Sequence, residues 1–211
     1  MNGLFNIDNP VWRFIGKIVD ACFLSVVYLI FCIPIFTIGS ATTALYYVCL
    51  KMVKDTEGYL VKDFVKAFYE NFKQSTIIWL ILLAFGLVLG IDLLYFKNVL
   101  TKTGFFMYYL ILILFLFYFI MYTYIFALSA QFKNTTKNMF KIAFALSIKH
   151  LGWTILIVVV SIIIILISLF IPILFLIFIP GILTFFNSFI FSHIFAPYIK
   201  NIQENENKNQ E

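Results

Sequence analysis

The carboxyl-terminal part of the chain contains fifty consecutive residues, from His150 to Ile199, without a single Asp, Glu, Lys or Arg. Its first portion, 151–171, alone exceeds the roughly 20 apolar residues that a helix needs to cross about 30 Å of hydrocarbon. A water-soluble domain of 211 residues has too little interior to bury so long an apolar run. With 63% hydrophobic and 12% charged residues, the chain is predicted to be a multi-spanning membrane protein in contact with the lipid bilayer.

Hydropathy and length predict an all-α fold, a polytopic membrane helix bundle that forms a single domain over residues 1–200. Five segments are long and apolar enough for complete spans, and these are 18–36, 76–95, 105–128, 151–171 and 173–194. A sixth apolar segment, 39–53, would cover only about 22 Å as a helix, which is less than a full crossing. The last residues, 201–211, are polar and are expected to be disordered.

A helix break is predicted between the first span and the short segment. Pro34 lacks a backbone donor and Gly39 tolerates unusual dihedral angles, so the helix should be interrupted around Thr37. Such breaks either hold ions or polar substrates on the freed backbone groups or simply turn the chain. We favour the turn, after which the segment 39–53 returns as a short helix.

The distribution of basic residues supports this return. If the short segment crosses back, both termini lie in the cytoplasm and 13 of the 15 Lys and Arg residues are on the inner side; otherwise the split is 11 to 4. The first arrangement fits the positive-inside rule better and predicts a multi-pass protein of the cell membrane. An alternative is cleavage of a signal peptide near Gly39-Ser40-Ala41, although the long amino-terminal region with its acidic residues argues against it.

An amphipathic helix is expected at 57–73, between the short segment and the next span. Its aromatic residues recur every four positions, and its lysines fall largely on the opposite side. Such a helix would lie in the membrane interface. Together with the basic loop 133–149 it would offer a cytoplasmic docking surface to a partner protein. The residues of the expected docking face are Phe64, Phe68, Phe72, Lys66 and Lys73.

Motifs that carry chemistry are not found in the sequence, so neither an enzyme nor a metal or cofactor site is expected. The three cysteines lack CxxC spacing, and the two histidines are far apart. Nucleic-acid binding is not indicated, because the lysines are dispersed beside apolar segments. Gly86 and Gly90 form a GxxxG pair, which suits helix contact within one monomer as well as dimerisation. The oligomeric state therefore stays open.

Three blocks in the amino-terminal third resemble the YesL family, multi-pass membrane proteins of Gram-positive bacteria that contain the domain of unknown function 624. The blocks are WRF at 12–14, IPIFTIGSATTALY at 33–46 and FVKAFYENFKQ at 64–74. Members are commonly encoded beside carbohydrate-uptake ABC transporters. The resemblance thus implies an accessory component of such uptake, with the transporter's membrane or nucleotide-binding subunits as partners. The alternative is an autonomous small transporter or channel whose broken first helix lines the pathway.

Overall fold

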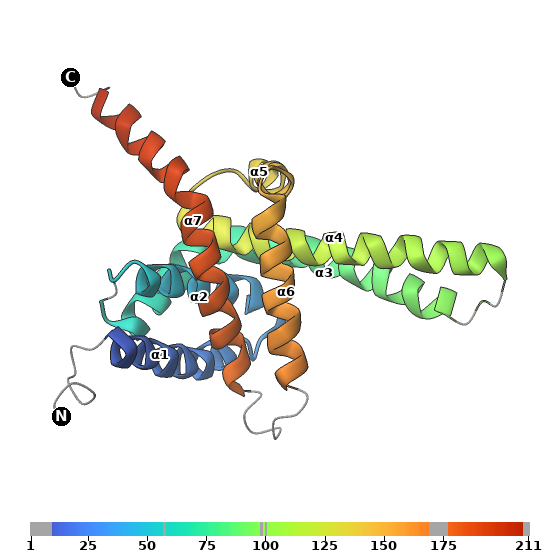
Figure 1. Ribbon diagram of the computed structural model, residues 1–211, viewed down its shortest axis with the longest axis horizontal. Helices are drawn as coiled ribbons and strands as arrows, with labels where there is room; N and C mark the ends of the chain where they lie inside the picture. Colours follow the sequence, from blue (N-terminus) through green and yellow to red (C-terminus); the bar gives the residue numbers. More distant parts are fainter. Residues whose placement is uncertain (1–9, 57, 98, 100, 169–176, 209–211) are drawn as a thin grey trace.

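The computed structural model describes the chain except for residues 1–9, 57, 98, 100, 169–176 and 209–211, and the described part contains helices but no strand (Figure 1). In chain order the elements are α1 (Pro10–Phe31), the 3-10 helix η1 (Ile35–Thr37), α2 (Ile38–Val53), α3 (Leu60–Lys97), α4 (Lys102–Gln131), α5 (Thr136–Lys149), α6 (Leu151–Ser168) and α7 (Ile179–Lys208). Within the described residues, six stretches of helix, one in every α-helix except α5, are long and apolar enough to cross a membrane. The predicted all-α membrane bundle is confirmed.

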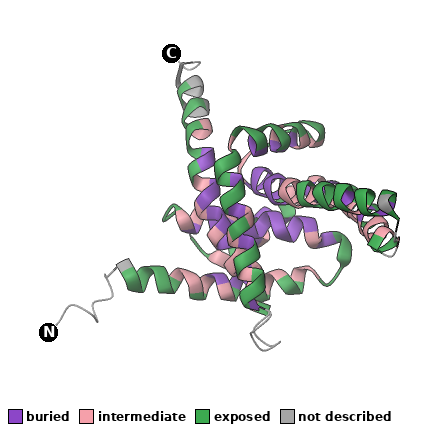
Figure 2. Ribbon diagram, turned by 45° about the vertical axis from the view of Figure 1, so that its right-hand side comes forward, coloured by how far each residue is buried: buried purple, intermediate pink, exposed green. Residues whose placement is uncertain are grey.

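The shortest α-helix of these six, α2, lies at the centre of the bundle. Twelve of its 16 residues are buried, and α1, α3, α4 and α7 pack around it (Figures 1 and 2). Its stretch also has the lowest mean hydropathy of the six, 1.2. Small residues at its start, from Gly39 to Ala44, let the neighbouring helices approach closely. Because protein rather than lipid surrounds α2, strong hydropathy is not required of it.

Helix α3 is continuous over 38 residues, a length of about 57 Å. The amphipathic helix predicted at 57–73 is present from Leu60 onward, but it is the first part of α3 and is not separate from the next span. Phe64 and Phe68 are only 0% and 5% exposed, and their rings lie 5.3 and 4.8 Å from the ring of Phe31 on α1, centroid to centroid. The aromatic stripe packs on protein instead of lipid because the end of α1 and the returning α2 both lie against this part of α3.

The second half of α3 and most of α4 form an antiparallel hairpin that projects from the rest of the bundle (Figure 1). Within the hairpin the rings of Trp79 and Tyr122 meet edge to face, with centroids 6.2 Å apart. The outer surfaces of both helices carry exposed apolar side chains, among them Ile91 on α3 and Phe106 on α4. In a membrane, such a surface contacts lipid or other membrane helices.

The basic segment 133–149, expected to be a loop, contains the helix α5. Its buried residues recur at helical spacing, and they are Met139, Ala143, Leu146 and Ser147. Helix α5 packs against α4 through this face, while Lys137 and Lys141 remain exposed. The apolar residues of this segment do recur with a helical period, but its many lysines led to the prediction of a loop.

The polar carboxyl-terminal segment is also helical as far as Lys208, so the expectation of disorder over 201–211 is wrong for 201–208. Lys200 and Glu204 lie one turn apart on this extension, with 3.9 Å between Nζ and Oε1, a pairing that supports an exposed helix. Of the last predicted span, 173–194, residues 173–176 lie outside the described residues, and α7 begins at Ile179.

Candidate functional site

The predicted helix break is present, and its backbone groups are satisfied by protein. Helix α1 ends at Phe31 and α2 begins at Ile38. The Thr37 hydroxyl lies 2.5 Å from the carbonyl oxygen of Phe31 and 2.6 Å from that of Pro34. The indole of Trp79 donates to the carbonyl of Ile35 at 2.8 Å. Because these carbonyls are already bonded, the geometry favours a turn over an ion-binding break.

Gly39 brings α2 and α3 into close contact just after the break. A Cβ atom at this position would lie 2.4 Å from the carbonyl oxygen of Ser75 and 2.5 Å from Cβ of Trp79. Hydroxyl pairs continue the contact, with Ser40 3.0 Å from Thr76. The predicted residues Pro34, Thr37 and Gly39 are thus brought together by the structure, but as a packed corner.

One helical turn inside the bundle from this corner lies a small cavity of about 100 Å³, which we call the central cavity. Helices α1, α2, α4, α6 and α7 contribute its walls. Its lining residues are Tyr28, Thr42, Leu45, Tyr46, Phe119, Tyr122, Thr123, Ser161, Pro180, Leu183, Thr184 and Asn187. Hydroxyl groups and aromatic rings predominate, and no acidic or basic side chain is among them.

Asn187 is the unusual member of the central cavity. It is 1% exposed, and its amide nitrogen donates to the Ser161 hydroxyl at 3.3 Å, yet its amide oxygen has no hydrogen-bond partner within the described structure. A buried acceptor without a partner costs free energy, and such groups are usually bonded to ordered water or to a neighbouring hydroxyl. The volume would admit about three water molecules or a small neutral solute.

The sequence reasoning missed Asn187, although a signal was present. Thr184, Asn187 and Ser188 lie at helical spacing within an otherwise apolar span, where polar residues face the protein interior. Ser161, the partner of Asn187, lies in another uncharged span, and neither span alone indicates that the two residues meet. The polar residues of α7 therefore indicate that this helix faces the protein interior, but the sequence does not show which other helices form the central cavity with it.

A charged junction connects the end of α2 to its neighbours. Asp55 follows α2 in the left-handed backbone region, with φ of 53°. Its carboxylate lies 2.7 Å from Lys17 Nζ and 3.0 Å from the Arg13 guanidinium. The hydrogen bond from Lys17, then the Lys17 charge and the Arg13 contacts, hold the pKa of Asp55 below its usual value. Lys51 and Asp63 form a second pair at 2.7 Å.

The expected docking face is divided by the structure. Phe64 and Phe68 are buried, Phe72 is half-buried, and only Lys66 and Lys73 are exposed. A partner approaching this part of α3 would therefore meet lysines but not the aromatic stripe. The prediction of an exposed aromatic docking face is wrong, for the packing reason given above.

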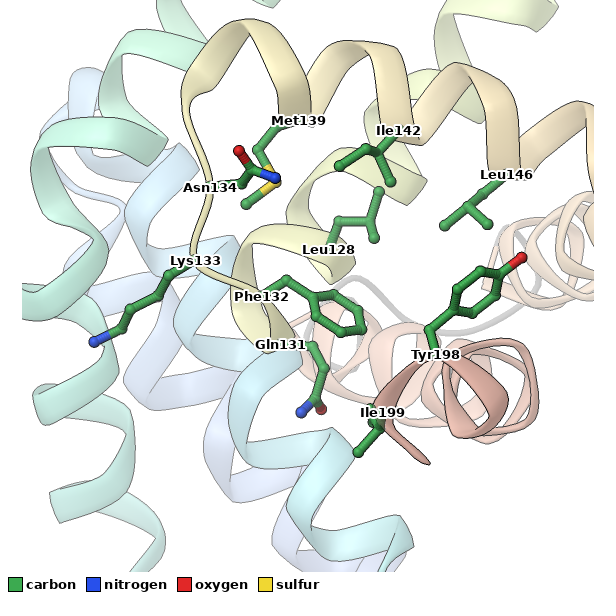
Figure 3. Close-up of a pocket in the computed structure, with 10 residues that line it drawn as sticks. All are labelled: Leu128, Gln131, Phe132, Lys133, Asn134, Met139, Ile142, Leu146, Tyr198 and Ile199. Carbon is green, nitrogen blue, oxygen red and sulfur yellow. The ribbon is translucent and has the colours of Figure 1, made fainter. Parts of the chain in front are cut away.

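A larger groove of about 550 Å³ lies where α4 ends, between α5 and α7, and we call it the α5–α7 groove (Figure 3). Its lining residues are Leu128, Gln131, Phe132, Lys133, Asn134, Met139, Ile142, Leu146, Tyr198 and Ile199. The Tyr198 hydroxyl lies 3.2 Å from Nε2 of His150, which fixes the tyrosine at one wall.

A comparison with known families matches about a third of the chain, in its amino-terminal part. Residues 18–93 match the family described as "Protein of unknown function, DUF624". This segment belongs to the DUF624 family. The DUF624 segment runs from within α1 to within α3, so it contains the break, all of α2 and one side of the central cavity. Asn187 and Ser161 lie outside it. No curated protein and no solved structure matches the chain.

Proposed function

We propose that the protein is an integral membrane accessory component of carbohydrate uptake, which contacts the membrane subunits of an ABC transporter. The resemblance of the amino-terminal third to the YesL family supports the link to uptake. The projecting α3–α4 hairpin is the observation that supports a role in contacting other membrane proteins (Figure 1).

The far half of this hairpin presents the surface that a partner helix requires. Leu87 and Ile91 on α3 are 58% and 65% exposed, and Phe106 and Ile113 on α4 are both 64% exposed. Between the α3 residues, Gly90 has no heavy atom within 4 Å of its Cβ position. An open glycine among apolar residues allows another helix to approach closely.

The two glycines of the GxxxG pair have different surroundings. A Cβ atom on Gly86 would lie 2.7 Å from the hydroxyl oxygen of Tyr118, so Gly86 serves contact inside the hairpin. Gly90 faces open space. We therefore assign the partner contact to the Gly90 side of α3.

The test is affinity capture of the tagged protein from mildly solubilised, cross-linked native membranes, followed by mass spectrometry. We expect a transporter permease subunit to be recovered with the wild-type protein and lost with Gly90→Leu. Gly152→Leu is the matched control, because Gly152 on α6 is also open. Recovery of the protein without any transporter subunit would refute the accessory role. Equal recovery with both variants would refute only the contact through Gly90.

The central cavity favours a second candidate function, autonomous transport of a small neutral solute. Its polar lining comes from α1, α2, α4, α6 and α7, and it includes the amide oxygen of Asn187, which has no partner within the described structure. Uptake into proteoliposomes of purified protein tests this function. Transport through the central cavity should be abolished by Asn187→Leu, whereas a pathway at the break itself should respond to Thr37→Val or Pro34→Ala. Absence of uptake by the wild-type protein would leave the accessory role as the single proposal.

A further inference from the structure

The interior of the α5–α7 groove is apolar. Leu128 and Phe132 from α4 and its end, and Ile142 and Leu146 from α5, direct their side chains toward one common space, and Tyr198 of α7 stands opposite them (Figure 3). The volume of about 550 Å³ lies within the roughly 300–1,000 Å³ typical of ligand sites. Water molecules would find few hydrogen-bond partners on such a lining, so an apolar chain is the favoured occupant.

Basic residues surround the mouth of the groove. Lys133 lines it directly, with its amine turned outward (Figure 3). Lys149 Nζ lies 5.2 Å from the centre of the Tyr198 ring, and Lys54 Nζ lies 3.3 Å from the amide oxygen of Gln131. None of these three lysines forms an ion pair with a carboxylate among the residues that the structure describes.

We propose that the α5–α7 groove binds an anionic phospholipid of the surrounding bilayer. One acyl chain lies between α5 and α7, and the phosphate headgroup is held by Lys133 and Lys149, with Lys54 at the far edge. An apolar cleft beside unpaired lysines complements such an amphiphile at both ends, and basic pockets between membrane helices bind anionic headgroups in this manner. The proposal is independent of any transporter partner.

The experiment uses the full-length protein in nanodiscs containing equal amounts of phosphatidylglycerol and phosphatidylcholine. After gentle extraction, native mass spectrometry counts the lipids that remain bound. We expect one retained phosphatidylglycerol per chain. The double variant Lys133→Gln/Lys149→Gln should reduce the preference for phosphatidylglycerol by roughly 10- to 30-fold, as expected for two lysines near an anionic surface. The matched control, Lys62→Gln/Lys66→Gln, removes two exposed lysines of α3 and should leave the preference unchanged.

A second variant tests the apolar half of the site. Leu146→Trp places a larger ring in the groove and should remove the retained lipid of either class. Ile142→Phe provides the same test if the tryptophan variant fails to fold, as judged by gel filtration. Equal retention of both lipids, unaffected by the Lys133→Gln/Lys149→Gln change, would overturn the proposal in favour of general solvation. A lipid-free dimer would overturn it in favour of a second copy covering the groove.

Discussion

Four residues determine the corner between α1 and α2: Pro34, Thr37 and Trp79 through their side chains, and Gly39 because it has none. Thr37 and Trp79 bond the carbonyls that the break frees, while Pro34 starts the turn. Gly39 allows α2 to lie directly on the backbone of α3 at Ser75. The corner is consequently sensitive to volume at Gly39 rather than to charge.

Gly39→Ala should destabilise the protein by about 1–3 kcal/mol, because the added methyl group meets the backbone of α3 and overpacks the contact. Thermal unfolding in detergent measures the change. Gly16→Ala is the control: Gly16 has no atom within 4 Å of its Cβ position, so this helical substitution should be neutral or stabilising by up to about 1 kcal/mol. Equal stability of the two variants would contradict the close α2–α3 contact.

Asp55 should make the stability of the charged junction depend on pH. Its pKa is lowered in the folded protein by Lys17 and Arg13, so its contribution is present above the unfolded pKa of about 3.9 and is lost as the pH falls through the lower folded value. Asp55→Asn keeps a residue that tolerates the left-handed backbone and removes the charge. The difference in unfolding temperature between wild type and this variant should shrink below about pH 4. A difference that is constant from pH 7 to pH 3 would contradict the prediction.

At the scale of helices, the sequence predicted the number of apolar segments but not how each one is covered. Pro34 correctly indicated the break between α1 and α2, because a proline interrupts a helix through its own backbone. The topology inferred from the basic residues stays a prediction. The continuity of α3 depends on packing against α1 and α2, and hydropathy contains no information about such packing. For the same reason, Phe64 and Phe68 were predicted to lie on an exposed face, whereas both are buried in the structure.

The continuity of α3 can be tested at Gln74, between the predicted interfacial helix and the predicted span. Gln74→Pro should cost about 3 kcal/mol or more, because proline removes a helical hydrogen bond and clashes with the preceding turn. Gln74→Ala controls for loss of the side-chain bond that Gln74 donates to the carbonyl of Asn134 at 2.7 Å. If two separate helices met there, the proline variant would unfold at nearly the same temperature as the alanine variant.

For the molecule as a whole, the sequence predicted the membrane class and the DUF624 segment, because composition and short motifs suffice for both. The candidate sites were less accessible. The central cavity draws its walls from five helices, and the α5–α7 groove joins residues about sixty positions apart, such as Met139 and Tyr198. Neither the central cavity nor the α5–α7 groove is therefore marked by a motif of neighbouring residues in the sequence.

The topology implied by the basic residues predicts that the turn between α3 and α4 lies outside the cell. With Cys22, Cys32 and Cys49 replaced by Ser, Lys97→Cys should react with a membrane-impermeant maleimide in intact cells. Lys133→Cys should react only after the membrane is permeabilised. The reverse pattern would contradict cytoplasmic termini, and labelling of both sites in intact cells would contradict a crossing by α4.

The position of α2 also has a consequence for biosynthesis. Helix α2 leaves the ribosome well before α7, which is one of the helices that enclose it. Until α7 arrives, the hydroxyl-bearing face of α2 at Thr42 and Tyr46 faces lipid or a chaperone instead of Asn187. A chain truncated before Ile179 would therefore insert its early helices yet leave its centre uncovered, and it would be a substrate for membrane quality control.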